Sequence, residues 1–270
     1  MNYYITGADG FIGKHLCKYL EGNFIYRIKR NDLTGLEFVL ESYPPDVVIH
    51  LAAYGNHYHQ KNVNETIKAN VFLLEDMIKL FRDTGMKKFY NISTSSVTLP
   101  VQTYYSLTKQ IGEKLIEAED ERFVNVRPYS VYGEYEADHR FIPTVIRCLE
   151  SGEEMELDPH AKHDWVYVED FIKAMLNIED TRNDLMYYVS GKSYNKTFPI
   201  GSAKCHTNLQ IVNKLEKISG KKLVYKPKTL REYDTKDWSA PYGVGGIKLD
   251  DGLKKVYEFR RTNIRVIKEA

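Results

Sequence analysis

The chain has 270 residues, a formal net charge of +1 and 43% hydrophobic residues, with Lys and Arg scattered along it. This composition is typical of a soluble globular protein and does not favour a nucleic-acid partner. No stretch reaches the roughly 18 apolar residues of a membrane span, and the first residues lack a secretory pattern, so we expect a cytoplasmic protein with no membrane partner. The three cysteines lie far apart without metal-ligand spacing, so we expect no metal site.

Strand-like and helix-like segments alternate in the first half of the chain. We expect strands at residues 2–6, 23–28, 46–53, 87–94 and 122–133, and helices at 14–22, 32–43, 64–85 and 106–120. The run DVVIHLAA at 46–53 is almost continuously apolar, as in a strand that is buried on both faces. This β-α-β-α order predicts an α/β fold with a parallel, doubly wound sheet.

The second half of the chain is less regular. We expect a helix at 140–152, then a strand, an acidic turn and a helix over 163–180, and a further helix at 207–220. The tail from residue 226 remains unassigned. We therefore expect a smaller α/β domain from about 131–163 and 191–270, beside a main domain of 1–130 with about 164–190.

A glycine-punctuated turn follows the first strand. Gly7, Gly10 and Gly13 lie in TGADGFIG, between the strand and the expected helix. Such glycines allow a tight turn and a close approach of the backbone to a pyrophosphate, and the helix N-terminus presents N–H groups to anionic charge. This context predicts dinucleotide binding rather than a plain loop.

A Tyr-x-x-x-Lys spacing occurs in the stretch TYYSLTK. Tyr105 and Lys109 share a helix face at this spacing, whereas Tyr104 has Thr108 at the same offset and no cation. A neighbouring cation lowers the pKa of a phenol from its usual value of about 10, so Tyr105 is the candidate for proton transfer. Because the spacing alone is common, its meaning depends on the rest of the chain.

Six motifs, from Met1 to about Ile178, follow one another in a characteristic order. They are TGADGFIG, DVVIHLAA, NISTSSV, the Tyr105–Lys109 pair, RPYSVYG and HDWVYVEDF. In this order they resemble the extended short-chain dehydrogenase/reductase family, in the branch that acts on nucleotide sugars, where DVVIHLAA would be the fourth strand. The resemblance implies a Rossmann sheet that binds NAD(P), a C-terminal domain that binds a nucleotide sugar, and a homodimer formed through two helices.

The resemblance also implies the catalytic roles. Tyr105 would be the general acid or base at the reacting oxygen, and Lys109 would lower the pKa of Tyr105 and hold the nicotinamide ribose. Thr94 would bond the reacting oxygen. Hydride transfer creates or consumes an alkoxide, so a poised phenol beside a cation supplies the proton near neutral pH. Only eleven positions (105 − 94) separate Thr94 from Tyr105, fewer than is usual in the family.

Residues after the second expected strand bear on the choice of cofactor. An acidic residue there favours NAD, but Lys29 and Arg30 suit the 2′-phosphate of NADP. Asp32 competes, yet it lies in a DLT segment similar to the family's adenine contact. We therefore expect NADP, with NAD as the alternative. The candidate cofactor contacts are Gly7, Gly10, Phe11, Ile12, Gly13, Lys29, Arg30, Asp32, Leu33, Ala52, Ala53, Tyr105, Lys109 and Tyr129.

The neighbours of Thr94 distinguish the reactions of the family. Dehydratases carry Asp-Glu after the catalytic Thr, whereas this chain has Ser95 and Ser96. GDP-fucose synthase, which this chain resembles in its short second-strand region, epimerises with a Cys and a His. Those positions are Ser96 and Arg140 here, although His139 is adjacent. There remain 4-keto reduction and C4 epimerisation with retained NAD, and the Lys29–Arg30 pair favours the reductase.

Substrate contacts are expected from polar residues on both sides of the site. The candidates are Ser95, Ser96, His139, Arg140 and Arg231, because hydroxyls suit a sugar and arginine forks suit a diphosphate. Asn70, Asp164 and Asp170 are expected to be structural. A hypothesis of another class is a non-catalytic nucleotide-binding sensor or scaffold, against which the intact Thr94, Tyr105 and Lys109 argue.

Overall fold

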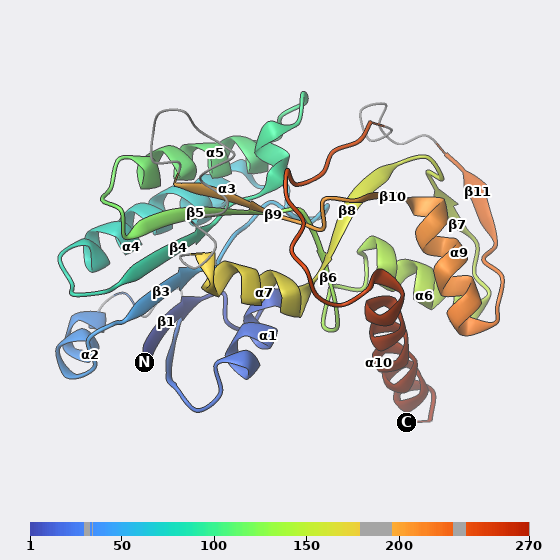
Figure 1. The fold of residues 1–270 in the computed structure, drawn as a ribbon, viewed down its shortest axis with the longest axis horizontal. Coiled ribbons are helices and arrows are strands. Elements are labelled where there is room, and N and C mark those ends of the chain that lie inside the picture. The colour runs from blue at the N-terminus through green and yellow to red at the C-terminus, as the bar shows by residue number, and fades with distance from the viewer. Residues whose placement is uncertain (30–32, 34, 179–195, 229–235, 270) are drawn as a thin grey trace. The chain divides into compact units, whose positions relative to one another are not determined.

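The structure is a computed structural model that describes residues 1–29, 33, 35–178, 196–228 and 236–269 (Figure 1). The chain forms two compact units. Unit 1 consists of Met1–Pro128 and Met175–Pro199, and unit 2 of Tyr129–Ala174 and Ile200–Ala270. Within the described residues, none of the helices combines the length and apolar character needed to cross a membrane.

A six-stranded sheet forms the centre of unit 1, in the order β2-β1-β3-β4-β5-β9. Its strands are β1 (Asn2–Thr6), β2 (Phe24–Ile28), β3 (Val47–His50), β4 (Lys88–Ile92), β5 (Phe123–Pro128) and β9 (Thr197–Ile200). The pairings of β1 with β2 and β3, of β3 with β4 and of β4 with β5 are parallel. The predicted parallel, doubly wound α/β sheet is therefore confirmed.

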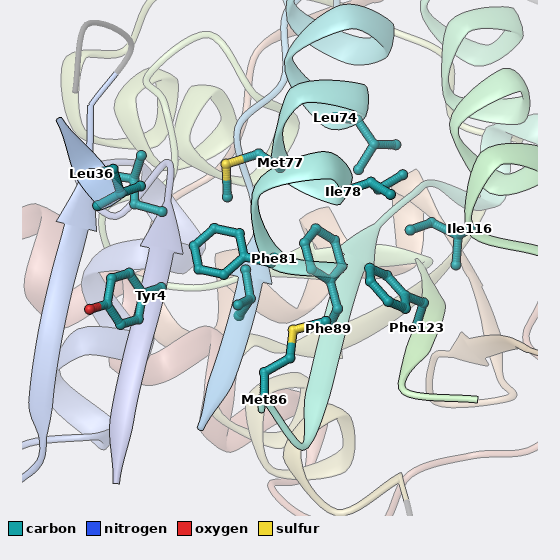
Figure 2. Packing of buried hydrophobic residues seen from close by; sticks show 12 residues of the cluster. Tyr4, Leu36, Leu74, Met77, Ile78, Phe81, Met86, Phe89, Ile116 and Phe123 are labelled. Carbon is teal, nitrogen blue, oxygen red and sulfur yellow. The ribbon is translucent and has the colours of Figure 1, made fainter. Parts of the chain in front are cut away.

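Helices connect these parallel strands. They are α1 (Phe11–Tyr19), α2 (Leu36–Ser42), α3 (Val63–Ile67), the π-helix η1 (Lys68–Phe72), α4 (Leu73–Arg82), the short 3₁₀ helix η2 (Ser95–Thr98) and α5 (Tyr104–Glu117). The helix expected at 64–85 is thus interrupted by a π turn. One apolar cluster joins α2, α4 and α5 to the sheet (Figure 2). The ring centroid of Phe81 in α4 lies 5.6 Å from that of Tyr4 in β1, and the ring of Phe89 stacks on that of Phe123.

The run DVVIHLAA forms the third strand of the chain rather than a fourth. All four residues of β3 are buried, as its apolar run predicted, and β3 pairs directly with β1. A single short helix, α2, lies between β2 and β3 among the described residues of this segment. As a result β2 forms one edge of the sheet.

Unit 2 is built from shorter strands and four helices that the structure describes. The strands are β6 (Ser130–Tyr132), β8 (Lys162–Tyr167) and β10 (Cys205–Thr207) in one sheet, and β7 (Met155–Leu157) with β11 (Tyr225–Pro227) in another. The helices are α6 (Phe141–Ser151), α7 (Val168–Leu176), whose last residues belong to unit 1, α9 (Asn208–Ser219) and α10 (Leu249–Glu269).

Two sequence-based expectations for this part of the chain were wrong, and one segment that had no assignment proved to be helical. The strand expected at 122–133 breaks at Tyr129 into β5 and β6, which belong to different sheets. Helix α7 starts directly after β8, so Glu169 and Asp170 form its first turn rather than a separate turn. The unassigned tail contains the long helix α10, in which Leu253 and Val256 are fully buried.

Candidate active site

The glycine turn is as tight as its sequence predicted. Gly7 has a φ of +68°, and a Cβ there would lie 2.9 Å from the Ala52 nitrogen. A Cβ at Gly13 would lie 2.3 Å from the Gly7 oxygen. A side chain at either position would therefore clash with the chain's own backbone, so the tight turn requires glycine at both. A glycine turn of this kind also allows the backbone to approach a dinucleotide closely.

The N-terminus of α1 follows this turn. Gly10 is its N-cap, with no side-chain cap and no acidic residue in the first turn, and the first helical hydrogen bond runs from Lys14 N to Gly10 O. The backbone N–H groups of Phe11, Ile12 and Gly13 precede that bond. A helix start of this kind fits a pyrophosphate.

The other candidate cofactor residues lie in different places. Lys29 is exposed just past β2, and Leu33 packs against the apolar cluster. Ala52 follows β3, and its N–H donates to Thr6 Oγ1 at 3.1 Å; Ala53 is the next residue and is exposed. Tyr129 belongs to unit 2, where its ring lies 5.2 Å from that of Trp238. Arg30, Asp32 and Arg231 lie outside the described residues.

Tyr105 and Lys109 lie in the first two turns of α5. The helix begins at a capping box between Thr103 and Ser106, which fixes where its first turn points. Tyr105 is partly exposed, whereas Lys109 is only 3% exposed and donates from Nζ to the Ile92 oxygen at 2.7 Å. Burial lowers the pKa of Lys109 to about 8, and the charge of Glu113 acts in the opposite direction.

Thr94 lies two residues beyond the end of β4 and caps η2. Its Oγ1 accepts a hydrogen bond from Ser96 N at 3.2 Å, so its position is fixed by the turn itself. Ser95 is buried and its carbonyl accepts from Thr98 Oγ1, while Ser96 is partly exposed. Because Ile92, the partner of Lys109, ends this same strand, β4 links Thr94 to Lys109.

Asn70 has the structural role that was expected. Its Oδ1 accepts from Tyr54 N at 2.9 Å, and its Nδ2 donates to Tyr54 O and to Thr108 Oγ1. Thr108 in turn donates to the carbonyls of Tyr104 and Tyr105. Asn70 lies in the π turn η1 and so ties the segment after β3 to the start of α5.

A buried polar network under β4 and β5 was missed at the sequence level. Glu113 accepts hydrogen bonds from Ser93 Oγ and from Arg127 Nε and Nη2. Asn125 links β4 to the helix: its Oδ1 accepts from Asn91 Nδ2, and its Nδ2 donates to the Glu113 carbonyl. The sequence signal that could have predicted part of this network is the spacing Lys109-x-x-x-Glu113, which places Glu113 one helical turn after Lys109 on the same face.

In unit 2, Arg140 is the N-cap residue of α6, and its Nε lies 3.9 Å from Glu136 Oε1. His139 directly precedes it and is exposed. Burial raises the pKa of Glu136 to about 8, against the opposing charges of Arg140 and Arg260. This places His139, Arg140 and Glu136 on one short segment between β6 and α6.

Asp164 and Asp170 are structural, as expected. The carboxylate of Asp164 accepts from the backbone nitrogens of Ser202, Ala203 and Ala240, and that of Asp170 accepts from Ile247 N. Both aspartates therefore hold loops of unit 2 together.

Comparisons with known proteins agree with this architecture. The family model "NAD dependent epimerase/dehydratase family" matches residues 3–185. The chain is 28% identical to "Uncharacterized UDP-glucose epimerase YtcB" of Bacillus subtilis (strain 168), over 82% of this chain and 83% of that protein. It is 27% identical to "CDP-abequose synthase" of Yersinia pseudotuberculosis, over 78% of this chain and 82% of that protein.

Solved structures agree on the fold. The structure "MoeE5 in complex with UDP-glucose and NAD" superposes with a TM-score of 0.79 at 21% identity, covering 98% of this chain and 100% of that chain. The match of the family model extends over the whole glycine turn, β3, β4 and α5, and so over the residues that form the site of unit 1. The chain belongs to the NAD dependent epimerase/dehydratase family and is an enzyme of that kind.

Proposed function

We propose that this chain is an NAD(P)-dependent oxidoreductase that reduces a 4-keto group on a nucleotide sugar. A bound nicotinamide would supply the hydride. Tyr105 gives its hydroxyl proton to the sugar oxygen, Thr94 bonds that oxygen, and Lys109 is the cation that makes Tyr105 a stronger acid. The ketone thus becomes an alcohol, with one hydride added to carbon and one proton added to oxygen.

The placement of Lys109 is the observation that carries this proposal. A lysine that is 3% exposed is rare unless it is paired, and the Lys109 ammonium is held by a backbone oxygen of β4 one helical turn from Tyr105. A solvated surface pair would leave the amine in water. The buried amine, the capped start of α5 and the fixed Thr94 hydroxyl together support a proton-transfer site.

The residues of unit 1 fit a nicotinamide dinucleotide, and we propose NADP. The glycine turn and the start of α1 suit the pyrophosphate, since glycine at positions 7 and 13 lets the turn fold tightly against its own backbone and the helix start presents free N–H groups. Lys29, exposed at the end of β2, is the described cation suited to a 2′-phosphate. For the nucleotide sugar, Ser95 and Ser96 are the candidate contacts in unit 1, and His139 and Arg140 remain candidates from the sequence in unit 2.

A C4 epimerase that retains NAD is the second candidate. Two observations favour it: a relative bears the name UDP-glucose epimerase, and the MoeE5 structure contains NAD. Elimination of water is disfavoured, because Ser95 and Ser96 offer no carboxyl pair after Thr94. The retention of the cofactor separates the two candidates.

We also propose a homodimer. On α5, Tyr104, Leu107 and Ile111 are exposed at helical spacing, and Phe72 of η1 is 54% exposed; α5 and η1 contact each other. An apolar stripe of this kind is unfavourable in water unless it is covered.

The experiment starts from purified, folded protein. A denatured sample is first analysed for released NAD(P), and the remainder is titrated with NADPH and NADH by energy transfer from Trp and Tyr. We expect exchangeable NADPH with weaker NADH binding, and a loss of that preference in Lys29→Ala but not in Lys18→Ala, an exposed lysine at the far end of α1. Retained NAD(H), or a clear preference for NADH, would move the assignment to the epimerase, and an unchanged preference in Lys29→Ala would remove Lys29 from the proposed 2′-phosphate site.

A further inference from the structure

A buried carboxylate lies one helical turn beyond Lys109. Glu113 is 2% exposed and accepts three hydrogen bonds, from Ser93 Oγ at 2.6 Å and from Arg127 Nε and Nη2 at 2.7 and 2.6 Å. The arginine fork is bidentate, which is the strong geometry for such a pair. The side chain of Glu113 is therefore held in one orientation.

The Glu113 carboxylate is connected to the candidate site by a hydrogen bond and by its position on α5. Ser93, which donates to Glu113, directly precedes Thr94 in the chain. Glu113 and Lys109 share a face of α5, and both are buried against the sheet. A carboxylate in that place connects the strand end that carries Thr94 to the helix that carries Tyr105.

The other ionisable groups around Lys109 add little charge. His50 of β3 is fully buried beneath the site, and burial together with Lys109 lowers its pKa to about 3, so it is neutral at working pH. The charge of Arg127 is neutralised by Glu113 itself. Tyr105, on the same helix, is the group that Lys109 is proposed to activate. Glu113 is thus the described anion that faces Lys109.

We propose that Glu113 is a positioning residue of the reductive site, which keeps Lys109 a cation through its charge and anchors Thr94 through Ser93. This rests on the proposed function, because Lys109 and Thr94 take their roles from it. The alternative is that the Glu113–Arg127 pair only joins α5 to β5. In that case its loss would destabilise the fold without changing the ionisation of Lys109.

The ionisation of Lys109 can be measured without any turnover. Protein labelled isotopically at lysine Cε is titrated by NMR, and Lys109→Met assigns the resonance. We expect Glu113→Gln to increase the acid dissociation constant of Lys109 by about tenfold, because an opposite charge is removed from its neighbourhood. Ser93→Ala, which keeps the carboxylate, is the matched control and should change that constant by less than about twofold.

Glu113→Gln leaves Arg127 buried without its carboxylate, so a second variant protects the test against unfolding. Glu113→Gln/Arg127→Gln removes both charges and should change the constant in the same direction but by less, because the opposing charge of Arg127 is lost as well. An unchanged Lys109 titration in either folded variant would overturn the proposal.

Kinetics then test the consequence for the reaction. With a 4-keto nucleotide sugar and NADPH, the alkaline limb of the pH profile of kcat should move to lower pH by about one unit in Glu113→Gln and by less in the double variant, with KM nearly unchanged. Ser93→Ala should lower kcat without moving the limb. If wild-type protein turned over no such substrate, the proposed function would fail, while the NMR titration would still decide the role of Glu113.

Discussion

The two compact units treat their buried polar groups differently. In unit 1, Glu113 has its hydrogen bonds completed by Ser93 and Arg127, and Lys109 donates to a backbone oxygen. In unit 2, Glu136 Oε2 and Arg260 Nε are buried without a hydrogen-bond partner among the described residues. Among the described residues, unit 2 has three more buried side-chain atoms without a hydrogen-bond partner: Trp165 Nε1, His206 Nδ1 and Asn208 Oδ1. Unit 1 has one, His50 Nε2.

This difference shows where the electrostatics of the molecule are already arranged. A completed network holds its charges in place before any substrate arrives, which is the condition for stabilising a developing charge without reorganisation. In contrast, a buried carboxyl group with an oxygen that lacks a hydrogen-bond partner tends to take up a proton and become neutral. Unit 1 is therefore expected to respond to mutation mainly in activity, and unit 2 mainly in stability and its dependence on pH.

The largest effect is expected for Tyr105→Phe. Removal of the hydroxyl takes away the proposed proton donor, so kcat should fall by about 10²- to 10⁴-fold while cofactor binding persists. Tyr104→Phe is the matched control, because Tyr104 is the neighbouring tyrosine and is 63% exposed. Comparable activity of the two variants, measured as oxidation of NADPH, would remove Tyr105 from the mechanism.

Glu136→Gln should stabilise the protein, and more so at high pH. The folded pKa of Glu136 is about 8 and its ordinary value is 4.5, so the folded state binds an extra proton between these values and stability falls as pH rises through this window. Glu136→Gln has no such ionisation, so its free energy of unfolding should exceed that of the wild type by on the order of 2 kcal/mol at pH values above 8. Urea titrations across pH measure it, with the exposed Glu153→Gln as control.

Lys109→Met should also stabilise the protein, but with the opposite dependence on pH. The folded pKa of about 8 lies below the ordinary 10.5, so the unfolded chain binds more protons between them and wild-type stability rises with pH there. The gain of the variant should therefore be largest near neutral pH, on the order of 1–2 kcal/mol, and shrink in alkali. An equal gain at all pH values would show that Lys109 is not a buried cation.

The smallest effect on folding is expected at the outer face of unit 1. Leu107→Lys/Ile111→Lys places charges on the apolar stripe of α5 and should turn a dimer into a monomer in sedimentation experiments. The free energy of unfolding of the monomer should change by less than about 0.5 kcal/mol, because both side chains are exposed. Val224→Lys, at an exposed apolar residue of unit 2, should leave the association state unchanged.

Local patterns predicted the parts of the fold that depend on short-range chemistry. The glycine turn and the buried run of β3 were both predicted, because each depends on residues close together in the chain, whereas the capped start of α5 at Thr103 lies before the expected helix of 106–120. The break at Tyr129 was not, because it is set by the sheets that β5 and β6 join. Helix α10 was missed although its own residues Leu253, Val256 and Tyr257, all buried, have helical spacing.

The candidate site shows the same limit. Tyr105, Lys109 and Thr94 were found by motif, but the partners of Glu113 come from β4 and β5 and are brought to it only by folding. The assignment of Lys29 to a 2′-phosphate stays a prediction from its charge, and the competing residue Asp32 lies outside the described part of the chain.

The π turn η1 makes the length of the chain itself a functional variable. Asn70 must face the backbone of Tyr54, while Leu74, Met77 and Phe81 must face the apolar cluster. A residue advances an α-helix by about 100°, so a regular helix through this segment could satisfy only one of these two directions. The extra residue that the π turn takes up lets both directions be kept, so insertion of one more residue between Asn70 and Leu74 would turn the apolar side chains of α4 by about 100° away from the cluster.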